Sequence, residues 1–308
     1  MQAHIANATY RATNLLSKAI KLETILRALT HVRSFLAPVF QRGHSLPHPV
    51  IVSLTSYPPR FPTAHLTIKT LLSQSIRPDK VILWLYEPDL AQLPECIKQL
   101  QGKRFEVRTV NRDLRSYKKI VPAVKAFSES YIVTADDDIY YNYDWLAELI
   151  KNHDSSEKCL TGHRGHKITY QNCGSINKYV EWRWCIGGLQ NGRDVFLTSG
   201  GGILFPPRSL PAVFLDEDTF MKHCGTADDI WIHFTARMNG YSFKKIPSHF
   251  REFSWGGSQS VSLNEINVGS SINDRSIEQL QSIFGAIKEG QSIARRDPQP
   301  QPQPQGGI

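Results

Sequence analysis

The chain has 308 residues, of which 41% are hydrophobic and 21% are charged, and its formal net charge is +8. These values indicate an ordinary globular protein with one large or two small domains. The sequence excludes a membrane-spanning helix, since no stretch reaches the roughly 18 uncharged apolar residues that such a helix needs. No helix-turn-helix, zinc-finger or RNA-binding signature accompanies the basic charge, so no nucleic-acid partner is expected.

Residues 1–45 are predicted to form a helical extension, because apolar residues recur there at helical spacing and the first proline is Pro38. Between residues 1 and 50 lie six basic residues against Glu23 alone. Two interpretations stay open. The helix packs on the domain or on another subunit, or it rests as a basic amphipathic helix on an anionic membrane surface.

The N-terminus lacks the charged start and apolar run of a signal peptide. Five cysteines form no CxxC pair and no short metal-ligand spacing, which favours a reducing compartment. We therefore expect a cytoplasmic protein, at the inner face of the membrane if the helix binds lipid.

From residue 50 the sequence alternates between apolar runs and amphipathic segments. Strands are predicted at 50–54, 81–86, 107–110 and 131–135, and helices at 63–75, 90–101 and 117–129. This alternation predicts an α/β fold with a doubly wound parallel sheet, whose ligands bind at the carboxyl ends of the strands. Farther on, the sequence predicts broken strand character at 195–205, a helix at 226–239, a strand at 243–246, a helix at 274–288 and a disordered tail at 297–308.

Three adjacent carboxylates, Asp136, Asp137 and Asp138, directly follow the fourth predicted strand in YIVTADDDIYY. Three neighbouring carboxylates repel one another, so stability alone does not explain them. Mg²⁺ and Mn²⁺ prefer carboxylate oxygens, and residues at i and i+2 can face one metal while the middle residue points elsewhere. A solvated acidic turn before the next helix is the alternative.

A strand that ends in Asp-x-Asp after two βα units resembles the GT-A fold of glycosyltransferases. The ordered motifs SLTSYPPR, VILWLYEPD, DLRSYKKIVPA, IVTADDDI and CGTADDIW are similar to bacterial glycosyltransferases related to family two, which build surface polysaccharides. The resemblance covers roughly residues 50–280. It implies a GT-A-like, mainly parallel sheet in a domain of residues 50–290, with a nucleotide-sugar half at 50–142 and an acceptor half at 143–290. The QxxRW motif of processive relatives is absent, which indicates single additions.

The resemblance also implies roles for individual residues. Asp138 is expected to bind the metal that bridges the donor diphosphate, and Asp136 to contact the ribose or the metal. Glu87 follows the second strand where relatives place an acidic residue against the base, and Lys119 matches a lysine of related motifs. His249 corresponds to the late histidine that many GT-A enzymes use as a third metal ligand, although a surface histidine is equally common.

The residues themselves suggest further donor contacts. Thr55, Tyr57 and Arg60 end the first strand, where hydroxyls and a ring suit uridine and a guanidinium suits a phosphate, although a proline-rich turn explains the segment equally well. The remaining donor candidates are Asp113, Asp137, Gly201 and Gly202. Cations after Asp113 suit a diphosphate, and the glycines allow a close backbone approach, unless they form only a bulge.

The second acidic motif, CGTADDIW, supplies the predicted catalytic residues. Asp229 is expected to act as the base that deprotonates the acceptor, with Asp228 as an acceptor contact or as the base itself. A carboxylate at a helix N-terminus stays ionised, as a base requires. Asp229 also lies three residues after Thr226, the spacing of a capping box, so a structural helix cap is the alternative.

The sequence thus predicts an inverting glycosyltransferase that depends on Mn²⁺ or Mg²⁺, with a UDP-sugar donor and a glycan or lipid-linked glycan acceptor. A nucleotidyltransferase shares the sheet and the paired carboxylates, but SLTSYPPR is not the Gly-rich basic loop that it needs. A non-catalytic carbohydrate- or nucleic-acid-binding protein is the other alternative, but it would have no function for the two acidic motifs.

Overall fold

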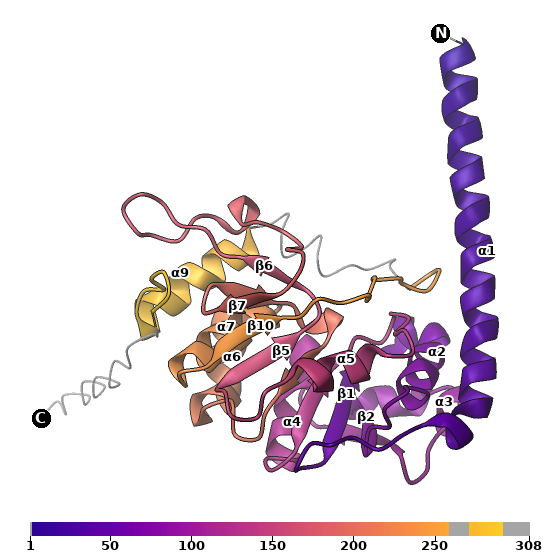
Figure 1. Ribbon diagram of the computed structural model, residues 1–308, viewed down its shortest axis with the longest axis horizontal. Coiled ribbons are helices and arrows are strands. Elements are labelled where there is room, and N and C mark those ends of the chain that lie inside the picture. The colour runs from indigo at the N-terminus through magenta and orange to yellow at the C-terminus, as the bar shows by residue number, and fades with distance from the viewer. Residues whose placement is uncertain (1, 259–270, 292–308) are drawn as a thin grey trace, which may run out of the picture.

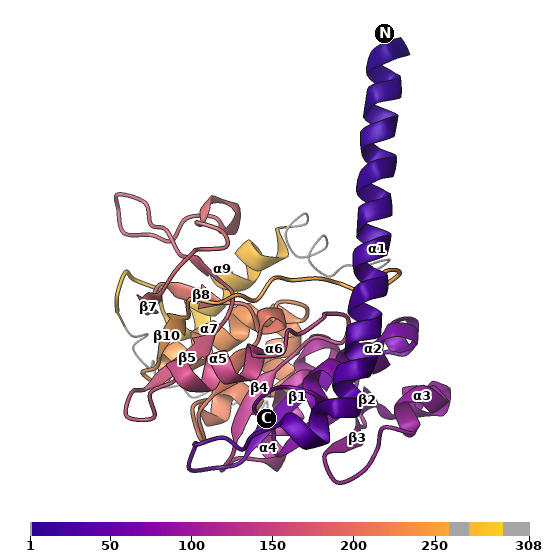
Figure 2. The same ribbon diagram turned by 45° about the vertical axis from the view of Figure 1, so that its right-hand side comes forward.

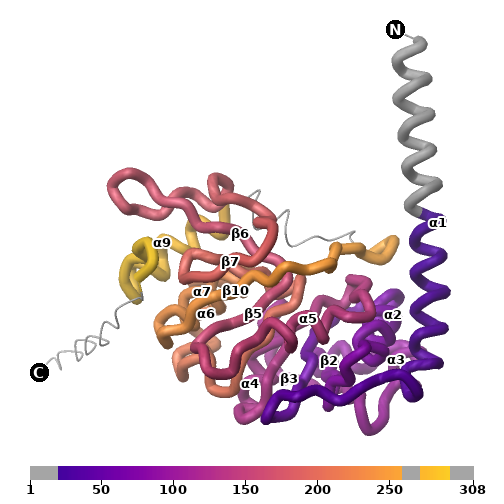
Figure 3. The backbone as a smooth tube through the Cα atoms, in the orientation of Figure 1, coloured from indigo at the N-terminus to yellow at the C-terminus, as the bar shows by residue number. Residues whose placement is uncertain are grey.

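The computed structural model describes residues 2–258 and 271–291, and it describes side chains from Ile20 onward. Figure 1 shows an α/β domain with a long N-terminal helix, α1 (Gln2–Phe40), at its side. The same arrangement is seen from a second direction in Figure 2 and as a backbone tube in Figure 3.

The remaining elements follow in chain order. The strands are β1 (Val50–Thr55), β2 (Lys80–Tyr86), β3 (Phe105–Val110), β4 (Tyr131–Thr134), β5 (Cys159–Gly162), β6 (Gly165–Lys167), β7 (Gln190–Gly192), β8 (Val195–Leu197), β9 (Ile203–Phe205) and β10 (Ser242–Lys245). The α-helices are α2 (Phe61–Leu72), α3 (Glu95–Lys98), α4 (Val121–Ala126), α5 (Trp145–Asn152), α6 (Glu217–Cys224), α7 (Asp228–Met238) and α9 (Ile272–Phe284). Short 3₁₀ helices are η1 (Pro58–Arg60), η2 (Glu87–Gln92), η3 (Arg115–Lys119), η4 (Tyr179–Glu181), η5 (Ser199–Gly201) and η6 (Ala212–Leu215).

The main sheet has the strand order β3-β2-β1-β4-β9-β5-β10-β7. The first four strands in this order are parallel, and so are β5 and β10, whereas β9 lies antiparallel between β4 and β5. Strands β6 and β8 form a separate small sheet. This confirms the predicted fold class, an α/β doubly wound, mainly parallel sheet with an N-terminal helical extension.

The order of the strands creates a switch point between β1 and β4. The chain runs from β1 outward through β2 to β3 and then returns to the other side of β1 to form β4. Open α/β sheets bind ligands in the crevice at such a point, outside the carboxyl ends of the strands. The segments that follow β1 and β4 are therefore the ones that the fold places at a site.

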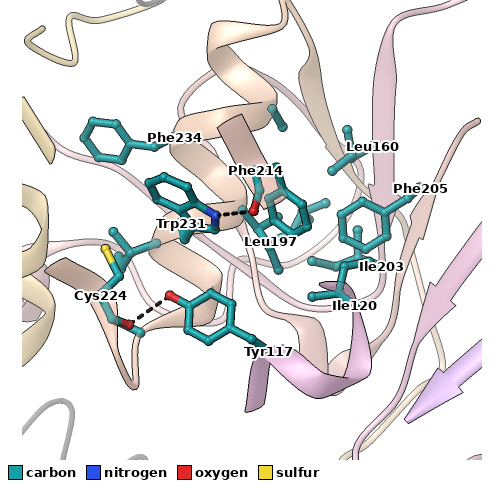
Figure 4. Close-up of a cluster of buried hydrophobic side chains, with 14 of the residues drawn as sticks. Tyr117, Ile120, Leu160, Leu197, Ile203, Phe205, Phe214, Cys224, Trp231 and Phe234 are labelled. Atoms are coloured by element: carbon teal, nitrogen blue, oxygen red, sulfur yellow. Dashed lines mark hydrogen bonds between the residues drawn. The ribbon is translucent and has the colours of Figure 1, made fainter. Parts of the chain in front are cut away.

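Helices cover both faces of the sheet, so its central strands are apolar on both sides. Val50, Val52 and Leu54 of β1 belong to one core with residues of α2 and α5. Ile51 belongs to the other core, which includes residues of α4, α7 and α9. Figure 4 shows part of this second core, where Trp231 Nε1 donates to Phe214 O at 3.1 Å and Tyr117 OH donates to Cys224 O at 2.8 Å.

Two predicted helices are shorter than their periodicity indicated, and prolines explain both. The helix expected at 90–101 is divided into η2 and α3, with Pro94 at the N-cap of α3. The helix expected at 117–129 becomes η3 followed by α4, where Pro122 lies in the first turn. A proline lacks the N–H that a continuing helix needs, but it is tolerated in a first turn. The strand expected at 195–205 is likewise interrupted by η5 at its glycines.

Helix α1 docks on α2 and on the loop before α5 through polar contacts. Arg33 Nη2 donates to Ser73 O at 3.2 Å and Gln41 Nε2 donates to Leu72 O at 2.7 Å, which together tie the C-terminal part of α1 to the end of α2. In the described part of the chain, no helix is both long enough and apolar enough to cross a membrane. The tail predicted at 297–308 lies outside the described residues.

Candidate active site

A cavity of about 770 Å³ opens at the carboxyl ends of β1 and β4, at the switch point of the sheet. Both acidic motifs of the sequence line it. The predicted residues that line the cavity are Thr55, Tyr57, Arg60, Asp113, Lys119, Asp136, Asp137, Asp138, Asp228 and Asp229. They come from segments that are up to 174 positions apart, so the fold brings most of the predicted site together.

The carboxylate triplet follows β4 and is held by groups that follow β1. Arg60 forms an ion pair with Asp138 and a longer contact of 3.5 Å with Asp137 Oδ1. The Ser56 hydroxyl donates a short hydrogen bond to Asp137. Arg60 is therefore shared by Asp137 and Asp138, whereas the i, i+2 pattern predicted a shared partner for Asp136 and Asp138.

Burial and mutual repulsion in the triplet outweigh the effect of these contacts on the pKa values. Burial and the charge of Asp138 raise the pKa of Asp137 to about 7, against the opposing effects of Ser56 and Arg60. Burial and the charge of Asp136 raise the pKa of Asp138 to about 6. Raised pKa values of this kind mark buried carboxylates whose ionised form is disfavoured.

Lys119 joins the two acidic motifs. Its Nζ lies 2.8 Å from Asp136 Oδ1 and 3.3 Å from Asp228 Oδ2, and the side chain is almost fully buried. Burial alone would lower the pKa of Lys119, but the charges of Asp136 and Asp228 outweigh it and raise the pKa. Lys119 is therefore charged over the whole range in which the protein is expected to work.

Asp229 is the second residue of α7 and is bound from outside the helix. Its Oδ1 accepts a hydrogen bond from the Ser199 N–H at 2.9 Å. The N-cap residue is Ala227, whose side chain makes no capping hydrogen bond. Burial and the charge of Asp228 raise the pKa of Asp229 to about 7, against the effect of Lys119. The carboxylate is thus less readily ionised than its helix N-terminus predicted.

Glycines let η5 pass close to the triplet. A Cβ at Gly200 would collide with the carboxylate of Asp136, and a Cβ at Gly202, whose φ is +103°, would lie 2.5 Å from Trp145 Cζ2. Gly200 lines the cavity. Gly201 and Gly202, the predicted contacts, instead pack behind its wall, where Gly201 O accepts from Trp145 Nε1 at 2.8 Å.

Two other predicted residues are not brought to the cavity. Glu87 lies in η2 and lines a separate pocket of about 380 Å³ with Arg112 and Lys125. His249 is exposed in the segment after β10 and does not line the cavity. Its neighbour Phe250 packs inward instead, with its ring 5.8 Å from that of Tyr141. The expected ligand set of Asp136, Asp138 and His249 is therefore not assembled.

One wall of the cavity comes from residues that the motifs did not indicate. Arg164 follows β5 and pairs with Glu252, which follows β10, at 2.6 Å. Because β5 and β10 are parallel neighbours, their carboxyl ends meet at the same edge. His166, Tyr179 and Trp184 add an aromatic surface to this wall. The segment GHRGH contained the signal, but four-residue β5 was too short to be recognised as a strand.

The carboxylate oxygens at the site suit a divalent cation, although the protein does not supply a complete set of ligands for it. Among the described residues, no three Asp, Glu, His or Cys side chains are close enough together to hold a metal ion. Mg²⁺ commonly takes one or two carboxylates and completes its shell with phosphate oxygens and water. Asp136 and Asp138, which both line the cavity, are the residues that suit this mode.

The comparisons with known proteins assign no family. No protein-family model matches the sequence, and no curated protein matches it. The structure is similar to GalNAc-T7 with UDP, GalNAc and Mn²⁺, at 9% identity and a TM-score of 0.43, over 76% of this chain and 50% of that one. It is also similar to HddC from Yersinia pseudotuberculosis complexed with GMP-PN, at 14% identity and a TM-score of 0.34, over 53% of this chain and 78% of that one. The chain thus spans about half the length of GalNAc-T7.

Proposed function

We propose that this protein is an inverting glycosyltransferase with a GT-A-like sheet, which transfers a sugar from a nucleoside diphosphate donor to a hydroxyl of a glycan or a lipid-linked glycan. The observation that carries the proposal is the Lys119 bridge, which joins the carboxylate triplet to the Asp228–Asp229 pair in one cavity. Such a transfer needs both a place for a charged leaving group and a base for the acceptor.

The donor half of the reaction falls to the residues around β1 and β4. Mn²⁺ or Mg²⁺, held by Asp136 and Asp138, would offset the negative charge of the departing diphosphate. Arg60 and Lys119 supply further positive charge at the cavity. A cation at Asp138 would compete with the Arg60 guanidinium, which would then be available to a phosphate oxygen. Thr55 and Tyr57 lie beside Arg60 in the lining and suit the nucleoside, for which we favour uridine.

The acceptor half falls to Asp229. Its carboxylate would take the proton of the acceptor hydroxyl while that oxygen bonds to the anomeric carbon and the bond from this carbon to the diphosphate breaks. A base works best when its pKa lies near the operating pH, and the pKa of Asp229 is raised to about 7. Trp184, which is 37% exposed on the same cavity, offers a ring face for the acceptor sugar.

The donor side is tested by calorimetric titration of UDP with Mn²⁺ into the wild type and the Asp138→Asn variant. We expect the variant to lose metal-dependent binding and to keep its fold by circular dichroism. Asp154→Asn is the matched control, because Asp154 is exposed after α5 and only caps its own turn through Ser156. Wild-type affinity in Asp138→Asn would refute the metal assignment.

The base is tested by single-turnover transfer at saturating donor. Asp229→Asn should slow transfer by about 10²- to 10⁴-fold at unchanged donor affinity. The Asn side-chain oxygen can still accept from the Ser199 N–H, so the substitution removes the base and retains this contact. If Asp228→Asn fails and Asp229→Asn does not, Asp228 is the base. Release of inorganic pyrophosphate from a nucleoside triphosphate and a sugar phosphate, in place of UDP release, would identify a nucleotidyltransferase.

A further inference from the structure

From Ile20 onward, most large apolar side chains of α1 are turned away from the domain, unlike those of an ordinary surface helix. Two polar residues face the domain instead: Thr30 is fully buried, and Arg33 Nη1 donates to Tyr140 OH at 3.0 Å. Six aliphatic residues are between 39% and 76% exposed: Leu22, Ile25, Leu29, Val32, Leu36 and Val39. A helix that only packs on its own domain buries its apolar stripe, so α1 retains an apolar face for something else.

These six residues, which we call the α1 seam, follow one another at alternating intervals of three and four positions without a break. That is the spacing of the a and d positions of a coiled coil, in which each seam residue enters a gap between four residues of a facing helix. Leu22, Leu29 and Leu36 take the a positions. Pro38 lies outside the seam.

The exposed apolar area is large enough for a stable contact. Phe35 and Phe40 flank the seam and are 83% and 62% exposed. At about 100–200 Å² per large apolar side chain, seam and flanks leave roughly 500–900 Å² of apolar surface. The largest apolar patch on a typical monomer is about 300–600 Å², whereas one side of a standard protein interface is about 800 Å².

We propose that the α1 seam packs against the seam of a second copy of this chain. An anionic membrane would select for free cations around the seam, and from Ile20 onward Lys21 is the one basic residue of α1 that the structure leaves exposed and unengaged. Arg27 pairs with Glu23 at 2.6 Å and lies 5.7 Å from the Trp255 ring centre. Arg33 reaches into the domain, and burial and the charge of Lys69 lower the pKa of His31, which keeps it neutral.

Two copies of α1 can also associate along the seam without repulsion between like charges. The positions that flank a coiled-coil seam carry Lys21, Ala28 and Phe35 on one side and Leu26, Arg33 and Phe40 on the other. In a parallel pair, the first of these sets faces the second, so Lys21 meets Leu26 and Phe35 meets Phe40. Arg33 stands opposite Ala28, but its guanidinium stays on the domain. Like charges, which would oppose assembly, do not face each other between residues 20 and 40.

The test is sedimentation equilibrium of the full chain and of two variants. The double variant Leu29→Glu and Leu36→Glu places charges in the seam, and its dissociation constant should rise by about 100-fold or more. Ile20→Glu is the matched control, because Ile20 is 57% exposed on the same helix but lies outside the seam. It should assemble like the wild type. Both substituted sets are exposed, and unchanged circular dichroism and UDP binding would show that the domain is intact.

Three results would overturn the proposal. A wild type that stays monomeric at about 100 µM lacks the contact. A double variant that still assembles like the wild type uses another surface. If the wild type is monomeric and binds vesicles of phosphatidylglycerol and phosphatidylcholine, and the double variant does not, the seam rests on a membrane instead.

Discussion

Replacing Lys119 by methionine tests the electrostatic account of the site most directly. The substitution keeps the hydrocarbon part of the side chain but leaves Asp136, Asp228 and Asp229 without the cation that contacts or faces them. Removal of one partner of a buried ion pair costs about 3–5 kcal/mol. Because the Asp136 side chain is 37% exposed to the cavity, we expect about 3 kcal/mol, or a melting temperature lower by roughly 5–10 °C.

The loss should depend on pH in a defined direction. Lys119 lowers the pKa of Asp229, so its removal raises a pKa that is already about 7. The folded state then binds more protons than the unfolded state over a wider range, so stability falls more steeply as the pH rises. Denaturant unfolding of the variant should therefore show a smaller loss at pH 5, where Asp229 is protonated, than at pH 8.

Lys118 provides the matched control. It is the preceding residue, it is equally buried, and its Nζ lies 2.6 Å from Asp113 Oδ1. Asp113 is 52% exposed and can be solvated when the lysine is lost. Lys118→Met should therefore cost no more than about 1–2 kcal/mol. Equal losses for the two variants, or a Lys119→Met loss that is the same at pH 5 and pH 8, would refute the reasoning.

Two further predictions concern the glycine turn and the cation. Gly202→Ala should destabilise the protein by about 2–5 kcal/mol in denaturant unfolding, because the φ of +103° at this position strains an alanine and the added Cβ would meet Trp145. Gly187→Ala should be nearly neutral, because a Cβ at Gly187 meets nothing within 4 Å. A similar effect of both substitutions would contradict the steric explanation. Mn²⁺ with UDP should raise the melting temperature more at pH 8 than at pH 5, because the pKa of the proposed ligand Asp138, about 6, leaves this carboxylate mostly protonated at pH 5. Equal shifts at the two pH values would argue against carboxylate ligation.

Much of the fold could be predicted from features that are local in the chain. The apolar runs that became β1, β2 and β4 are buried on both faces, and such runs indicate parallel strands without knowledge of their neighbours. The edge strand β3 is only partly buried. The triplet at Asp136 was recognisable because three adjacent carboxylates have no local stabilising role. Pro94 and Pro122 were visible as well, and the shorter helices around them follow from proline chemistry rather than from packing.

The contacts between distant segments were decided by the tertiary structure alone. Hydropathy does not specify that β9 lies antiparallel between β4 and β5, yet this order helps to set where the residues that follow β5 and β10 reach the cavity. Hydropathy therefore could not reveal that Arg164 and Glu252 form a wall of the cavity, or that His249 lies outside the cavity lining. Nor does helical periodicity say which side of α1 meets the domain. Arg33 points toward the domain and the leucines toward solvent because only the domain surface offers hydrogen-bonding partners, and only the assembled domain supplies them.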